Sequence, residues 1–155
     1  RKIRKIFGFL REGFFNRMFF ERKMTLYYFD TSIWLDVFEK RENFDLIQKL
    51  LDTIISNSDT ILYSQVIIDE LKMQGYSYQD VVLLFYPFKK ILRYTDAGHN
   101  HLGKAKDLAE KRNLPKRDAL HALITREEHA LLITRDRHFL ELKDICKCVL
   151  LKNVV

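Results

Sequence analysis

The chain has 155 residues, of which 47% are hydrophobic and 31% are charged, with two prolines and five glycines. This composition is that of an ordinary globular domain, long enough to bury its own core without a disulfide or a structural metal. The formal net charge is +6, but residues 1–23 carry all of the excess, because they hold eight basic and two acidic residues. Residues 24–155 hold nineteen of each sign, so a basic surface there depends on how the charges are arranged.

Residues 1–23 are predicted to form a basic amphipathic N-terminal helix, separate from a domain at 24–155. The residues of its apolar stripe recur at steps of three and four: Ile3, Phe7, Leu10, Phe14 and Met18. Charged residues interrupt every apolar run of about 18 residues that could span a membrane, and no secretory signal pattern is present. We expect this helix to pack on its own domain or on a second copy of the chain. Binding to a membrane surface is the less favoured alternative.

The domain at 24–155 reads as short apolar strands that alternate with helices. Strands are predicted at 26–29, 59–63, 90–94, 130–134 and 147–152. Helices are predicted at 33–41, 43–56, 64–71, 77–88, 96–111, 116–129 and 137–141. This alternation predicts an α/β protein with a three-layer α/β/α architecture around a parallel sheet.

The two cysteines indicate a reducing compartment and no zinc site. Cys146 and Cys148 are two residues apart on what reads as extended chain at the last strand, and we expect their side chains to face opposite sides and to remain reduced in the cytoplasm. No second cysteine pair or spaced histidine pair completes a tetrahedral zinc set.

Four acidic residues stand at the boundaries of predicted elements. Asp30 directly follows the first strand, and Asp136 follows the fourth. Glu70 lies one to two turns into the helix after the second strand, and Asp118 lies in the first turn of a later helix. In an open parallel sheet the ligand crevice lies beyond the carboxyl ends of the strands. Acids at these positions therefore favour chemistry over packing.

Each acid also has a structural explanation. Asp30 and Asp136 could cap the helices that follow them, and Asp118 would be stabilised by the positive end of its helix. Glu70 could form an ion pair with Lys72 or Lys89.

Taken together, four short motifs resemble those of PIN-domain ribonucleases, whose compact members include the VapC-type toxins of toxin–antitoxin pairs. The resemblance covers Leu26 to about Lys152. It depends on Asp30-Thr31-Ser32, on Ser64 through Glu70-Leu71, on Asp118-Ala119-Leu120-His121-Ala122 and on Thr134-Arg135-Asp136-Arg137-His138-Phe139. His121 departs mildly from the family pattern, which usually has an apolar or small residue there. It could be a partly buried core histidine.

The resemblance implies a four- or five-stranded parallel sheet and an endoribonuclease that hydrolyses RNA phosphodiester bonds. Asp30, Glu70, Asp118 and Asp136 are then the catalytic acids. Four converging carboxylates repel one another, so without a cation at least one should have a raised pKa. Oxygen ligands select Mg²⁺ or Mn²⁺, and two such ions could activate water and stabilise the leaving oxygen.

Other residues receive supporting roles in this interpretation. Ser32 and Thr134 are expected to orient the carboxylates. Arg117, Arg135 and Arg137 flank the acids and could hold the RNA backbone, although solvated surface arginines are the commoner case. The expected partners are RNA, a second copy of the chain in a homodimer and an antitoxin protein.

Two rival functions are weaker. A phosphatase that forms an aspartyl-phosphate usually needs Asp-x-Asp at the first strand tip, whereas this chain has Asp30-Thr31-Ser32. A PIN-like module that binds nucleic acid or acts as a scaffold without catalysis would be favoured if an acid were replaced, and all four are present.

Overall fold

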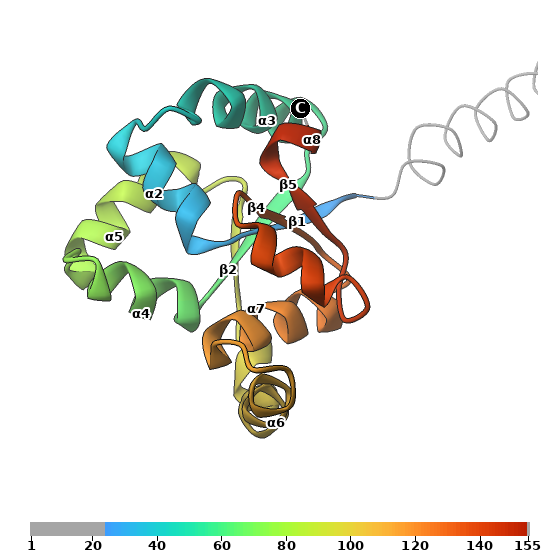
Figure 1. Cartoon of the computed structure of the whole chain (residues 1–155). Helices are drawn as coiled ribbons and strands as arrows, with labels where there is room; N and C mark the ends of the chain where they lie inside the picture. Colours follow the sequence, from blue (N-terminus) through green and yellow to red (C-terminus); the bar gives the residue numbers. More distant parts are fainter. Residues whose placement is uncertain (1–23, 155) are drawn as a thin grey trace, which may run out of the picture.

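The computed structural model describes residues 24–154 as one parallel sheet with helices on both faces (Figure 1). The strands are β1 (Leu26–Phe29), β2 (Thr60–Ser64), β3 (Leu92–Thr95), β4 (Leu131–Thr134) and β5 (Cys148–Leu150). The α-helices are α2 (Thr31–Glu39), α3 (Phe44–Ser56), α4 (Gln65–Met73), α5 (Tyr78–Phe85), α6 (Leu102–Arg112), α7 (Lys116–Glu127) and α8 (Leu151–Val154). Short 3-10 helices are η2 (Tyr86–Phe88), η3 (Ala97–His101) and η4 (Arg137–Leu142). The helix predicted at residues 1–23 lies outside the described residues.

The sheet has the order β3-β2-β1-β4-β5, and every pair of neighbours is parallel. The chain moves outward from β1 to β3 and then returns to place β4 on the other side of β1. The direction of winding therefore reverses between β1 and β4. In parallel α/β sheets this reversal opens a crevice at the carboxyl ends of the two strands.

Helices cover both faces, as the predicted three-layer α/β/α architecture requires. Figure 1 shows α2, α4 and α5 on one side of the sheet, with α6 and α7 on the other. Right-handed crossovers account for this division, because the chain travels in opposite directions across the sheet in its two halves. Each helix that returns from the carboxyl edge begins at that edge. The first turn of α7 consequently lies near the ends of β1 and β4.

An aromatic cluster anchors α2 on the sheet. Trp34 of α2 is fully buried. Its ring packs against four phenylalanines at centroid distances of 4.7–5.8 Å: Phe29, Phe38, Phe85 and Phe88. Aromatic contacts of this kind bury large apolar areas and fix ring orientation. The start of α2, and with it Asp30, is thereby held rigidly at the end of β1.

The C-terminal segment differs from the prediction. The expected strand at 147–152 ends at Leu150, and residues Leu151–Val154 form α8. Leu151 is buried, and α8 packs against α3. Burial of this apolar residue against a helix favours a turn of helix over an additional strand residue, which would extend past the neighbouring strand β4. The predicted helix at 96–111 also begins differently, as the 3-10 helix η3.

The prediction that the two cysteine side chains face opposite sides was wrong. Cys146 precedes β5, and both thiols are free and buried. Burial raises the pKa of Cys146 to about 12, with a smaller contribution from the neighbouring Cys148. The two thiols thus lie close together, because alternate residues of an extended chain share a face.

Candidate active site

Asp30 occupies the junction between β1 and α2, at the crevice where the winding reverses. Its backbone N–H donates to the carbonyl oxygen of Ile133 at 3.2 Å, which ties it to β4. Its carboxyl Oδ1 accepts hydrogen bonds from Ile33 N–H at 3.2 Å and from the Ser32 hydroxyl at 2.5 Å. The Thr134 hydroxyl donates to Oδ2. Asp30 is therefore the cap of α2, and its two oxygens are also oriented from two sides.

Asp30 is only 4% exposed, and this burial is the main influence on its pKa. Desolvation raises the pKa of Asp30, although the hydrogen bonds from Ser32, Thr134 and Ile33 act in the opposite direction. The raised pKa agrees with the prediction for an acid in a metal-free crevice. Its main cause is burial and not repulsion between carboxylates.

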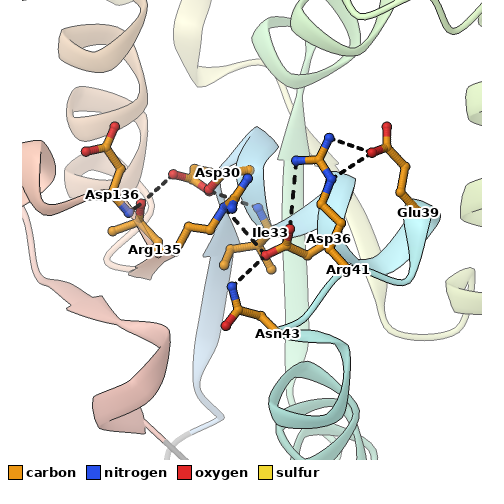
Figure 2. A network of polar contacts seen from close by, with 10 residues as sticks. Asp30, Ile33, Asp36, Glu39, Arg41, Asn43, Arg135 and Asp136 are labelled. Atoms are coloured by element: carbon orange, nitrogen blue, oxygen red, sulfur yellow. Dashed lines mark hydrogen bonds and ion pairs between the residues drawn. The ribbon is translucent and has the colours of Figure 1, made fainter.

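Thr134 links two of the predicted acids. It is fully buried at the end of β4, and its oxygen accepts the backbone N–H of Asp136 at 2.9 Å while its hydroxyl donates to Asp30. The Asp136 carboxyl accepts the His138 N–H at 2.9 Å and so caps η4. Figure 2 shows Asp30 and Asp136 on adjacent chain segments.

Glu70 interacts with a histidine and not with the lysines considered from the sequence. Its carboxyl contacts Nε2 of His121, which lies on α7 and is 1% exposed. Nδ1 of His121 lies 2.7 Å from the Tyr28 hydroxyl, which itself lies 2.7 Å from the Ser64 hydroxyl. A buried polar chain thus leads from β1 and β2 to Glu70 on α4.

Asp118 lies in the first turn of α7 and is half-buried. Burial is the largest cause of its raised pKa, and the charges of Glu70, Asp136 and Asp30 raise it further, whereas His121 lowers it. Asp118 and Asp136 also line one cleft of about 290 Å³. The charges of the other three acids therefore act on Asp118.

The predicted arginines differ in their surroundings. Arg135 reaches toward the fully buried Asp36, with 3.5 Å between Nε and Oδ2 (Figure 2). Asp36 also accepts a hydrogen bond from Asn43 at 3.1 Å and lies 3.9 Å from Arg41. Arg117 and Arg137 are exposed. Arg135 is exposed as well, but it belongs to an ion-pair network around the buried Asp36, which the sequence did not indicate.

A second cleft, of about 300 Å³, is lined by the two residues that flank Asp136 in the sequence, Arg135 and Arg137. Arg135, Arg137 and Lys152 contribute basic side chains to its walls, alongside Glu42. The described part of the chain thus gathers three cations next to the candidate acids, although its overall charge is balanced.

Comparison with known families decides the classification of this fold. The PIN domain family profile matches residues 27–145, which include all four acids. The chain belongs to the PIN domain family. No curated protein matches it in sequence.

Solved structures support the same fold for this PIN domain. It resembles a chain of VapBC2 from Rickettsia felis, solved with a promoter DNA fragment, with 19% identity and a TM-score of 0.63 over 81% of this chain and 98% of that one. VapBC-1 from nontypeable Haemophilus influenzae gives 18% identity and a TM-score of 0.61 over 83% and 99%. FitAcB from Neisseria gonorrhoeae gives 15% identity and a TM-score of 0.53 over 79% and 96%.

The donor set fits a hard divalent cation in its chemistry. Four carboxylates supply only oxygen ligands, which Mg²⁺ and Mn²⁺ prefer. Among residues 24–154, however, no three His, Cys, Asp or Glu side chains are already arranged as a metal cage. Asp30 and Glu70 instead direct oxygens toward Ser32, Thr134 and His121. A cation would therefore compete with these hydrogen bonds for some carboxylate oxygens.

Sequence reasoning missed the polar chain behind Glu70. Tyr28 lies within an apolar strand and reads as a packing residue, and Ser64 reads as a helix cap. His121 stands three residues after Asp118, on the same helix face, and this spacing was the available signal.

None of the helices described between residues 24 and 154 has the length and apolar content to cross a membrane.

Proposed function

We propose that this PIN domain is a metal-dependent endoribonuclease that hydrolyses RNA phosphodiester bonds. The observation that supports the proposal is the position of Asp30 and Asp136 at the ends of β1 and β4, where the winding reverses, together with the charges of Glu70, Asp136 and Asp30, which raise the pKa of Asp118. A merely structural set of acids would be expected to find separate basic partners. Here the side-chain partner of Glu70 is a buried histidine and not a lysine or arginine.

The four acids would hold Mg²⁺ or Mn²⁺, with Asp30 as the ligand shared between two ions. A bound cation would supply an activated water and would stabilise charge on the phosphodiester oxygens. The chain itself contributes orientation: Ser32 fixes one oxygen of Asp30, and Thr134 fixes the other. Such partners of a ligand commonly set its geometry and basicity.

The cleft lined by Arg135, Arg137 and Lys152 would receive the RNA backbone beside these acids. Clustered cations attract the phosphate backbone irrespective of sequence, and their contribution falls as salt rises. Asp36 holds Arg135 in place, so this residue would present a fixed charge. Arg137 and Arg117 are exposed and would act as adaptable contacts.

We further propose that the protein is a cytoplasmic toxin that pairs with an antitoxin and forms a homodimer. The similar structures from Rickettsia felis and Haemophilus influenzae are described as VapBC assemblies, which supports a protein partner here. Two free, buried cysteines are compatible with a reducing compartment.

A cleavage assay tests the enzymatic proposal. Purified protein is incubated with single-stranded and structured RNA in Mn²⁺, in Mg²⁺ and with EDTA, and compared with Asp30→Asn and Asp52→Asn. Asp52 is an exposed acid of α3 and provides a matched control for loss of one negative charge. We expect endonucleolytic products with either metal, none with EDTA and a loss of at least about 100-fold in Asp30→Asn alone.

Full activity in Asp30→Asn, or activity that persists in EDTA, would contradict the proposal. RNA binding without cleavage by the parent protein would favour the binding or scaffolding module instead. A gel-shift measurement on the same samples shows whether a parent protein that does not cleave RNA still binds it.

A further inference from the structure

The polar chain from Ser64 to Glu70 joins the residue before α4 to a residue within α4 through two other elements, β1 and α7. Ser64 precedes α4, and Glu70 lies on the same helix. Tyr28 on β1 and His121 on α7 join them. Ser64, Tyr28 and His121 are each at most 2% exposed. Water is therefore excluded from every link except the last, where Glu70 is partly exposed.

The donor directions follow from the chemistry of the partners. A carboxylate only accepts, so Nε2 of His121 carries the hydrogen that contacts Glu70. In a neutral imidazole Nδ1 then accepts, and the Tyr28 hydroxyl donates to it. Burial raises the pKa of Tyr28, which keeps that hydroxyl protonated. Because the tyrosine hydrogen is committed, Ser64 donates to the tyrosine oxygen, and all donors point toward Glu70.

The Ser64 hydroxyl contacts Tyr28 and does not cap α4. Ser64 occupies the position before α4 with extended backbone, yet its side chain makes no capping hydrogen bond. Asp30 and Ser77 at equivalent positions both cap their helices. A serine at a helix start ordinarily accepts a backbone N–H. Its diversion toward Tyr28 indicates that the buried chain takes precedence over the cap at this site.

We propose that His121 is a positioning residue, which holds the carboxylate of Glu70 in the orientation that binds the divalent cation. The inference rests on the proposed metal-dependent function. Nδ1 is fixed by Tyr28, the ring packs near Phe139 at a centroid distance of 6.3 Å, and the helix carbonyl of His121 accepts the Thr125 hydroxyl. The imidazole is therefore held in one orientation, and its contact with Glu70, which lies on a different helix, sets the orientation of the Glu70 carboxylate.

The substitutions that test this role act on one link at a time. His121→Leu removes both hydrogen bonds while keeping an apolar side chain in the core. His121→Gln retains an N–H donor that can reach Glu70. Tyr28→Phe leaves His121 in place but removes the donor to Nδ1. Asp30→Asn serves as the variant in which the proposed cation site itself is damaged.

The measurement is the dissociation constant of Mn²⁺ for RNA-free protein, obtained from the electron paramagnetic resonance signal of unbound Mn²⁺, with melting temperatures recorded on the same samples. We expect His121→Leu to weaken binding by about 10- to 100-fold, the usual effect of losing a residue that orients a metal ligand. His121→Gln should recover most of the loss. The dissociation constant of Mn²⁺ for Tyr28→Phe should lie between those for His121→Gln and His121→Leu.

Two results for His121→Leu would overturn the proposal. Wild-type affinity in His121→Leu, with only a lower melting temperature, would show that His121 serves packing alone. Loss of Mn²⁺ binding with unchanged Mg²⁺ binding would show that the imidazole is itself a ligand. If His121→Leu does not fold, the comparison of His121→Gln and Tyr28→Phe with the parent decides between the same outcomes. A parent protein that binds no Mn²⁺ would refute the proposed function, and the positioning role with it.

Discussion

Asp30 combines two roles that are usually considered separately. It caps α2 through Ile33 N–H, and its oxygens are also oriented by Ser32 and Thr134. A cap requires one oxygen, whereas this residue has both engaged in a buried position. The second engagement, from Thr134 on a strand far away in the sequence, is more than a cap requires, and it supports the proposed role of Asp30 as a cation ligand.

The pKa of Asp30 makes stability depend on pH with a defined sign. Because this pKa is raised by burial, the folded state keeps a proton over a range in which the unfolded state has released it. The free energy of unfolding therefore falls as pH rises through that range. Asp30→Asn removes the effect. Urea denaturation in EDTA should therefore show that the free energy of unfolding of the variant rises relative to that of the parent between about pH 4 and pH 7. At neutral pH we expect it to be at least as stable as the parent. A difference that is the same at both pH values would contradict this.

Thr134→Val removes a donor to Asp30 and an acceptor for the Asp136 N–H. We expect a loss of about 1–3 kcal/mol in the free energy of unfolding, because buried polar groups lose a partner, and a drop in RNA cleavage of roughly 10-fold or more. Urea denaturation and initial cleavage rates measure the two effects.

Thr95→Val provides a matched control for Thr134→Val. Thr95 is also buried at a strand end, donates to Glu128 at 2.8 Å and accepts the Ala97 N–H at 3.2 Å. The control should lose similar stability and keep its cleavage rate. Equal loss of activity in both variants would mean that Thr134 acts through stability alone.

At the scale of elements, the helix starts and strand ends explain most of the site. Apolar runs that stop at Asp30 and Asp136 predicted the strand ends correctly, because burial and the turn residues act locally. The contact between His121 and Glu70 was not predictable in this way, since it joins α7 to α4 across 51 positions of sequence. The start of α8 was also missed, because it depends on packing against α3.

The left-handed residue that ends α2 gives a test at this scale. Lys40 has φ 49°, a conformation that costs a residue with a Cβ about 1–2 kcal/mol. Lys40→Gly should therefore raise the free energy of unfolding by about 1 kcal/mol, less any loss from the greater freedom of the unfolded chain. The exposed Lys49 lies within α3, and Lys49→Gly should lower it by about 1 kcal/mol. If urea denaturation showed changes of the same sign in the free energy of unfolding for Lys40→Gly and Lys49→Gly, this account would be contradicted.

For the whole molecule, the sequence allowed the layers and parallel strands to be predicted from alternation alone. The winding reversal between β1 and β4 follows from the strand order, which alternation does not reveal. The balance of charge in residues 24–155 was correct as a sum. The clustering of Arg135, Arg137 and Lys152 appears only once the ends of β4 and β5 are side by side.

The N-terminal segment gives a test at the same scale. The core formed by residues 24–154 is extensive, so a chain that begins at Met24 should still unfold in one cooperative transition. Loss of this transition would show that residues 1–23 belong to the domain core. The prediction that residues 1–23 pack on a second copy is tested by light scattering, because the shortened chain should then have the mass of a monomer.

The central claim is that Asp30, Glu70, Asp118 and Asp136 bind a divalent cation together. The most direct measurement is anomalous diffraction from crystals soaked in Mn²⁺, which locates manganese independently of activity. We predict an anomalous peak within ligand distance of Asp30 and of at least one other acid of the four, absent from crystals of Asp30→Asn. A well-occupied peak elsewhere, or none at this crevice at saturating Mn²⁺, would contradict the assignment.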